Sequence, residues 1–209
     1  MYHNVLTCNF QCAILYIKLG NFERKVFMEL VQPIRDRETI QQVKDILKRN
    51  GYRDYLLFVA GINTGLRISD LLTLKVLDVR DKDHVVIKEK KTGKTKRFLI
   101  NGCFKQNLDG FINSMSDDEY LFQSRNGDNK PLTRMQAYRI INDACKKAGI
   151  KDQIGTHTLR KTFGYHHYQQ YKDVAILQDI FNHSAPSVTL RYIGINDDMK
   201  DKTMQDFAL

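Results

Sequence analysis

An arginine stands in the middle of the segment Thr64–Leu72, which reads TGLRISDLL. Gly65 suits a turn, and Ser69 or Asp70 can begin a short helix just after Arg67. The first turn of a helix has free backbone N–H groups, so a guanidinium held there can join them around an anion. The alternative is a surface arginine that caps the helix or pairs with Asp70. Taken alone, the motif fits this alternative better.

A second motif places His157 three positions before Arg160. Positions three apart lie on one face of a helix, so the imidazole and the guanidinium would be neighbours. Arg160 can hold two phosphate oxygens in a fork, and His157 can transfer a proton near neutral pH. The alternative is a helix surface with ordinary polar residues, because a motif of two residues has little specificity.

A third motif combines His183 with the run Thr189–Ile193, in which Tyr192 follows the histidine by nine positions (192 − 183). A tyrosine hydroxyl, with a pKa of about 10, is a weak nucleophile until nearby cations stabilise its oxyanion. Two arginines, two histidines and a lysine could supply that field. The alternative for Tyr192 is an amphipathic side chain half-buried in a helix, which is a common role for tyrosine.

Helices must position most of these residues. Asp36 can cap a first helix that Gly51 ends, with an apolar face at helical spacing. We expect helices at residues 36–50, 52–63, 102–114, 133–148, 157–171, 173–182 and 186–193, and the polar tail at 196–207 could form one more.

A small sheet interrupts the helices. Residues 84–88 and 95–100 have the composition of strands, and the glycine in the segment 89–94 suits a hairpin turn between them. With Val76–Val79 as a third strand, the predicted fold is mainly α with a small three-stranded antiparallel β-sheet.

The charge balance indicates a polyanionic partner. The 209 residues contain 33 Lys and Arg against 24 Asp and Glu, a net charge of +9. Nucleic acid is the commonest such partner, although a basic soluble protein without one is equally compatible with composition alone. The hydrophobic fraction of 42% fits a globular protein and argues against disorder.

Compartment and cofactors follow from what the sequence lacks. The scattered cysteines form no C-x-x-C pair, which predicts a reducing cytoplasm. The first residues lack the features of a signal peptide, and their apolar run 13–19 is too short to span a bilayer, so no membrane association is expected. The sequence has no P-loop and no convincing carboxylate cluster, and we predict neither a metal site nor a cofactor.

In this order and spacing, the three motifs resemble those of the tyrosine recombinase family, which includes phage integrases of the lambda type and Xer-type recombinases. The family's arginine motif matches Thr64–Leu72, its H-x-x-R box matches His157 and Arg160, and its T-x-x-Y motif matches Thr189 and Tyr192. Its third histidine, usually in L-G-H, matches His183, and its hairpin lysine in K-T-G matches Lys91.

The resemblance covers roughly residues 33–195 and implies the catalytic-domain fold of DNA breaking-rejoining enzymes. Asn182 replaces the family's usual glycine before His183, and asparagine also tolerates a left-handed helix end. Gly155-Thr156 stands where a proline often precedes His157, which affects only the start of the helix.

The resemblance also implies a mechanism for DNA integration and recombination. Arg67 and Arg160 would hold the non-bridging oxygens of one phosphodiester, and Tyr192 would attack phosphorus to leave a 3′-phosphotyrosine. Lys91 would protonate the departing 5′-oxygen. His157 would assist as base or acid, His183 would hydrogen-bond the phosphate, and Asp70 would orient the arginine site.

Other cations are expected to contact the DNA backbone. On the hairpin, Lys88 and Lys90 alternate with Lys91, so only one set can face the cleft, and the K-T-G match decides for Lys91 as the reacting residue. The predicted DNA-binding residues are Lys90, Lys94, Lys96, Lys161 and Arg191.

We expect residues 1–30 to be a short segment without an independent domain, and residues 31–209 to form the catalytic domain with a tail at 196–209. Family members usually carry a DNA-clamping domain upstream, for which about 30 residues are too few. The resemblance implies double-stranded DNA as a partner and a homotetramer on paired sites, joined through the C-terminal tail.

Three alternatives stay open from the sequence. One is a catalytically impaired DNA-binding regulator, or an integrase fragment without its core-binding domain. Another is a type IB topoisomerase-like activity, which uses similar chemistry to relax supercoils. The third is a helix-turn-helix DNA-binding domain, which the hairpin and the matched residues disfavour.

Overall fold

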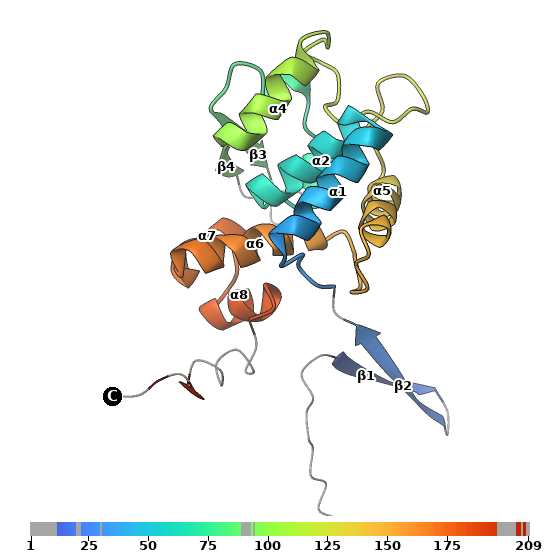
Figure 1. The fold of residues 1–209 in the computed structure, drawn as a ribbon, viewed down its shortest axis with the longest axis vertical. Helices are drawn as coiled ribbons and strands as arrows, with labels where there is room; N and C mark the ends of the chain where they lie inside the picture. Colours follow the sequence, from blue (N-terminus) through green and yellow to red (C-terminus); the bar gives the residue numbers. More distant parts are fainter. Residues whose placement is uncertain are drawn as a thin grey trace, which may run out of the picture.

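The computed structural model describes residues 31–88, 93, 95–195, 204, 205 and 207, and the backbone of two strands before them (Figure 1). The strands are β1 (Cys12–Leu19), β2 (Phe22–Glu29), β3 (His84–Lys88) and β4 (Thr95–Leu99). The helices are α1 (Arg37–Asn50), α2 (Tyr52–Thr64), α3 (Ile68–Leu71), the 3₁₀ helix η1 (Val76–Asp78), α4 (Gly102–Ile112), α5 (Arg134–Lys147), α6 (Thr158–Tyr171), α7 (Val174–Phe181) and α8 (Pro186–Tyr192).

The ends of these helices follow local chemistry that the sequence carries. The carboxylate of Asp36 accepts a hydrogen bond from the Thr39 backbone N–H at 2.7 Å and caps α1. Thr133 and Gln136 form a capping box at the start of α5. Asn182 ends α7 with φ 53° and ψ 49°, the left-handed conformation expected for it. The predicted helices in the described part of the chain are confirmed within a few residues.

Helix α2 is the centre of the main hydrophobic core. Its residues Leu56, Leu57, Phe58 and Val59 are fully buried, and it packs against α1, α4 and α6. Its contact with α6 is close, because a Cβ on Gly61 would lie 2.4 Å from the Cδ1 of Leu159. This packing fixes the start of α6, which carries two of the predicted site residues.

A smaller hydrophobic cluster joins the last three helices. Its buried members are Leu177, Phe181, Ile193 and Ile195. A Cβ on Gly164 of α6 would lie 2.6 Å from Ile193 and 2.7 Å from Phe181. The absent side chain therefore lets α7 and the end of α8 lie directly on α6.

The predicted three-stranded sheet is wrong. Among the described residues, β3 pairs only with β4, in the antiparallel register His84 to Leu99 and Lys88 to Thr95. The expected third strand is η1, because the Asp78 carboxylate accepts from the Lys75 backbone N–H at 2.8 Å and closes a capped turn. The apolar residues in Val76–Val79 suit a buried turn as well as a strand.

The N-terminal strands form a second antiparallel pair, in which Cys12 lies opposite Glu29. The predicted tail helix at 196–207 falls mostly outside the described residues, of which Met204 and Gln205 are helical. Within the part of the chain that is described, no helix has the length and apolar character needed to cross a membrane.

Candidate active site

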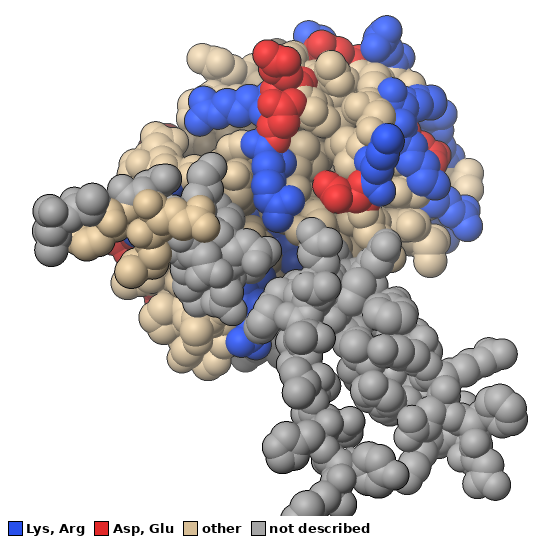
Figure 2. Space-filling model, turned by 60° about the horizontal axis from the view of Figure 1, so that its bottom comes forward, with Lys and Arg blue, Asp and Glu red and all other residues tan. Residues whose placement is uncertain are grey.

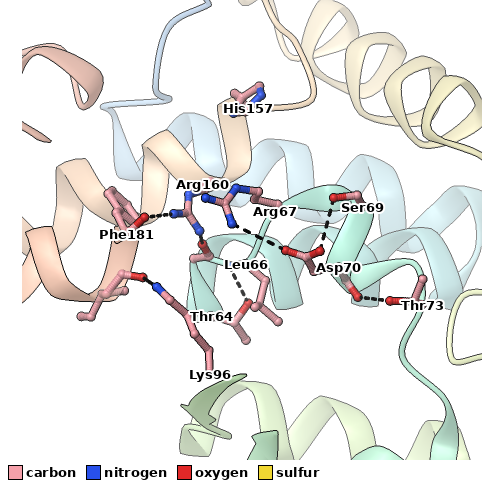
Figure 3. A network of polar contacts seen from close by, with 12 residues as sticks. Thr64, Leu66, Arg67, Ser69, Asp70, Thr73, Lys96, His157, Arg160 and Phe181 are labelled. Atoms are coloured by element: carbon pink, nitrogen blue, oxygen red, sulfur yellow. Dashed lines mark hydrogen bonds and ion pairs between the residues drawn. The ribbon is translucent and has the colours of Figure 1, made fainter. Parts of the chain in front are cut away.

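Arg160 is buried where three elements meet (Figure 3). Its Nη1 donates to the Gly65 carbonyl at 2.6 Å, and its Nη2 donates to the Phe181 carbonyl at 2.9 Å. The guanidinium carbon also lies 4.3 Å from the centre of the Phe181 ring. Gly65 must be glycine here, because its φ is 64° and a Cβ would lie 2.5 Å from the Phe163 ring. Arg160 therefore joins the loop before α3 to the end of α7.

Arg67 is the N-cap residue of α3, as its position after the glycine turn predicted. Its Nη1 lies 4.0 Å from the Asp70 carboxylate, whose other oxygen accepts from Ser69 Oγ at 3.4 Å. The Asp70 side chain is 4% exposed and that of Arg67 is 19% exposed, so the carboxylate holds the guanidinium from behind. Figure 3 shows the guanidinium groups of Arg67 and Arg160 side by side. Two neighbouring cations of this kind form a binding site for one anion.

Tyr192, the last residue of α8, lies against the histidine of the second motif. Its hydroxyl is 3.1 Å from Nδ1 of His157, and the two ring planes are at 85°. Burial raises the pKa of Tyr192, and the nearby charges of Arg160 and Arg67 oppose this rise. The hydroxyl therefore contacts a potential proton acceptor and lies within the electrostatic influence of the arginine pair.

His183 follows the left-handed residue that ends α7. Its Nδ1 lies 3.0 Å from the Thr189 hydroxyl, which is fully buried. Its ring centre is 5.1 Å from that of Tyr192. Thr189, the threonine of the third motif, thus orients the histidine that lies beside the tyrosine.

Burial sets the protonation states of these residues. It lowers the pKa of His183 to about 4, with Arg160 and Arg67 contributing further. It also lowers the pKa of His157, assisted by Arg160 and then Lys161. Burial raises the pKa of Tyr192, which the two arginines oppose. At neutral pH both imidazoles are therefore uncharged, and Nδ1 of His157 can accept a proton from the tyrosine hydroxyl.

Two of the five predicted lysines lie in the described part of the chain. Lys90, Lys91 and Lys94 fall outside the described residues. The Lys96 ammonium donates to the Ile180 carbonyl at 2.6 Å, in the last turn of α7. Lys161 is buried and donates to the Val31 carbonyl at 2.7 Å.

Of the predicted DNA contacts in the described part of the chain, Arg191 is exposed on α8. Lys96 is partly exposed and Lys161 is buried, and each ammonium donates to a carbonyl group of the chain. A sequence does not distinguish a lysine that contacts DNA from one that binds a backbone carbonyl, because the long side chain can reach either.

Residues 31–36 lead into α1, and we call them the lead-in segment. The Ile34 backbone N–H donates to the Thr162 hydroxyl at 2.9 Å, and Gln32 N–H donates to the Gln153 carbonyl at 3.1 Å. Both bonds involve backbone atoms and join distant parts of the chain, and Ile34 and Thr162 are separated by 128 positions. No local pattern predicts such contacts.

The assembled groups suit nucleophilic attack on a phosphate ester. Two adjacent guanidiniums can hold the anionic oxygens, and a hydroxyl lies beside them with a neutral imidazole as proton acceptor. The structure brings together Arg67, Asp70, His157, Arg160, His183 and Tyr192, which come from four separate parts of the chain.

Comparison with known sequences gives consistent matches. The sequence model of the protein family described as "Phage integrase family" matches residues 35–199. The probable integrase/recombinase YoeC of Bacillus subtilis (strain 168) is 53% identical over 171 residues, which are 82% of this chain and 93% of that protein. The tyrosine recombinase XerA of Pyrococcus furiosus is 28% identical over 161 residues, and the match spans 76% of this chain and only 56% of that one.

Solved structures show the same fold. A crystal structure of XerA recombinase matches with a TM-score of 0.70 at 22% identity, covering 86% of this chain and 67% of that one. A lambda integrase dimer bound to a COC′ core site matches with a TM-score of 0.65 at 17% identity, covering 80% of this chain and 49% of that one.

Proposed function

The chain belongs to the phage integrase family, and on this premise we propose that it is a tyrosine-type site-specific recombinase, which cleaves and rejoins DNA through a 3′-phosphotyrosine. The observation that carries the proposal is the position of the Tyr192 hydroxyl, 3.1 Å from Nδ1 of His157 and under the electrostatic influence of Arg160 and Arg67. The same tyrosine in a merely structural role has no need of a neutral imidazole and a buried cation at its hydroxyl.

The reaction begins with a phosphodiester bound between Arg67 and Arg160. The Tyr192 oxygen attacks phosphorus while its proton passes to Nδ1 of His157. The new bond joins the tyrosine oxygen to phosphorus, and the bond from phosphorus to the 5′-oxygen breaks. Fixed guanidiniums stabilise the additional negative charge of the transition state, where preorganised cations have their largest effect.

The departing 5′-oxygen needs a proton, and we assign its delivery to Lys91, on the motif match alone. Attack by a 5′-hydroxyl on the phosphotyrosine reverses the step and rejoins a strand. The phosphotyrosine retains the energy of the original bond, so the reaction as written needs neither a nucleotide cofactor nor a metal. His183, fixed by Thr189, is placed to donate a hydrogen bond to the phosphate.

The substrate we propose is double-stranded DNA, and the compartment is the cytoplasm. Similar solved structures support the first point, because they include a lambda integrase dimer on a core site and XerH bound to a difH substrate. Figure 2 shows Lys and Arg side chains gathered on the side where α5 lies in Figure 1. Helix α5 contributes the exposed cations Arg134, Arg139, Lys146 and Lys147.

We further propose that residues 31–209 act as the catalytic domain and that four copies assemble on paired sites through the tail at 196–209. Removal of the tail should then weaken assembly and spare single-site cleavage. Loss of all cleavage on truncation would count against this role of the tail.

Covalent trapping tests the proposed reaction. The protein is mixed with nicked duplexes drawn from the DNA that flanks its gene, and an adduct stable in SDS is sought for the wild type and for Tyr192→Phe. An adduct with the wild type alone supports the proposal. Measurable DNA binding without an adduct contradicts it and favours a DNA-binding regulator.

A further inference from the structure

Lys161 lies next to Arg160 on α6, yet its ammonium belongs to a different environment. The residue is 9% exposed, and its Nζ donates to the Val31 carbonyl at 2.7 Å. The same Nζ lies 5.2 Å from the centre of the Tyr192 ring. One buried cation therefore joins the lead-in segment to the ring of the proposed nucleophile.

Burial of this ammonium is energetically unfavourable. Within the described residues, no carboxylate forms an ion pair with it. Burial lowers the pKa of Lys161, and Arg35 lowers it further. An apolar side chain of similar length, such as methionine, would fill the same space without that cost. A buried ammonium to which the described residues offer no acidic partner is thus better explained by a role near the reacting groups than by stability.

The carbonyl that holds the ammonium is itself held firmly. Val31 packs against the loop before His157, where a Cβ on Gly155 would lie 2.7 Å from Val31 Cγ2. Two residues that follow Val31 are also hydrogen-bonded to the fold. The Gln32 N–H donates to the Gln153 carbonyl, and the Ile34 N–H donates to the Thr162 hydroxyl. His166 adds a further contact, 3.0 Å from the Ile34 carbonyl. The Val31 oxygen is therefore a fixed anchor for Lys161.

We propose that Lys161 is a positioning residue of the recombinase site, which holds the Tyr192 ring in place and keeps a positive charge beside the Tyr192–His157 pair. The proposal rests on the proposed function. A cation near the ring of a neutral tyrosine is attractive, and the attraction grows when that tyrosine becomes an anion. The hydrogen bond to the Val31 carbonyl keeps the ammonium at this position, away from surface water and DNA phosphates.

The second effect of Lys161 is on His157. Four cations act on this imidazole, Arg160 and Lys161 from α6, Arg134 from α5 and Arg67 before α3, and the titratable Tyr192 hydroxyl of α8 contacts it. Each of the cations disfavours a proton on His157. Loss of Lys161 should therefore raise the pKa of His157 and leave less of the neutral form that accepts the tyrosine proton.

The test compares Lys161→Met with Lys161→Arg and with Lys172→Met in the full chain. Lys172 is a matched control, because it ends the same helix and its Nζ lies 5.4 Å from the centre of the Tyr168 ring, at an exposed site. The rate of covalent adduct formation on nicked duplexes from the DNA flanking the gene is measured from pH 5 to 9 under single-turnover conditions. Thermal unfolding is recorded for each variant.

Lys161→Met should slow adduct formation roughly tenfold near neutral pH, with the acidic limb of the pH profile shifted to higher pH. Lys161→Arg should restore the position of that limb, and Lys172→Met should match the wild type. A parallel slowing at every pH, with an unmoved limb, would show a packing role only and overturn the proposal. An unchanged rate would also overturn it.

A measurement without DNA separates this inference from the proposed function. The pKa of His157 is followed by NMR of its ring protons, assigned with His157→Gln. It should rise by roughly 0.5 in Lys161→Met and stay constant in Lys172→Met. If the wild type forms no adduct, the proposed function fails, and this titration still decides whether Lys161 acts on the pair. A pKa of His157 that is the same in all variants would overturn the inference.

Discussion

The arginine region and the nucleophile region of the site are built differently. The arginine region comprises Arg67, Asp70 and Arg160, and it rests on α2 and α3 within the main core. The nucleophile region comprises α7 and α8 with His183 and Tyr192, and its own buried cluster is small. Helix α6 connects the two regions, and the Arg160 guanidinium donates to the Phe181 carbonyl and lies over the Phe181 ring. The arginine region therefore rests on the larger hydrophobic core, and the region around Tyr192 rests on the smaller one.

The largest effect should come from breaking that connection. Arg160→Ala removes the cation that we propose stabilises the transition state, and it leaves the Gly65 and Phe181 carbonyls without this donor. We expect a loss of about 10³-fold in the rate of adduct formation and about 3 kcal/mol in the free energy of unfolding. Single-turnover cleavage and urea denaturation measure these two quantities.

Arg160→Lys is the matched control, since it keeps the charge and loses the fork that reaches both carbonyls. Its cleavage rate should lie between those of the wild type and the alanine variant. Wild-type cleavage in Arg160→Ala would contradict the assignment of this residue to the clamp.

A pair of glycine substitutions should separate the two regions. Gly61→Ala places a methyl group against Leu159 in the main core, and Gly164→Ala places one against Ile193 and Phe181 in the small cluster. Each should cost about 1–3 kcal/mol of unfolding free energy. Gly164→Ala should reduce adduct formation far more than DNA binding, because it displaces α8. Gel-shift and trapping assays on both variants test this, and equal losses of binding and cleavage in Gly164→Ala would argue against a separable nucleophile region.

Acid should destabilise the nucleophile region through its histidine. The folded state lowers the pKa of His183 from 6.5 to about 4, so the unfolded chain takes up the proton first as the pH falls. The contribution to stability is complete above about pH 6.5 and is lost as the pH falls toward 4. We expect a decrease of about 1–2 kcal/mol, after allowance for partial exposure, in denaturation curves measured across that range. His183→Gln should flatten this decrease, and an unaltered pH dependence in the variant would refute the assignment.

The smallest effect should come from the end of α7. Asn182 has a φ of 53°, where a side chain with a β-carbon is strained and asparagine is tolerated. Asn182→Ala should lower the unfolding free energy by about 1 kcal/mol, while Asn182→Gly should leave it unchanged or raise it slightly. Thermal melts compare the two, and equal melting temperatures would show that the strain is absent.

The sequence predicts the helical framework well because the signals are local. Asp36, Thr133 and Asn182 each act within a turn of their own helix, and the structure has the caps where these residues stand. The three motifs also predicted which residues gather around the tyrosine, because their order matches a known family.

Long-range backbone contacts were beyond such reasoning. The prediction of a third strand was wrong, because the apolar residues of Val76–Val79 are as compatible with a buried, capped turn as with a strand. Lys161 was expected on DNA, and the carbonyl it binds belongs to Val31, 130 positions away. A sequence shows the type of every side chain, whereas every residue has a backbone carbonyl, and the sequence does not show which of them accepts a particular hydrogen bond.

The most direct test of the central claim is to map the site of covalent attachment. The chain contains 10 tyrosines, and Tyr165, Tyr168 and Tyr171 lie on α6, the helix that carries Arg160. The trapped adduct is digested with a protease and a nuclease, and mass spectrometry locates the tyrosine that carries the nucleotide phosphate. The account predicts the modification on Tyr192 alone. A nucleotide on any other tyrosine, or none in a protein that binds the DNA, would contradict it.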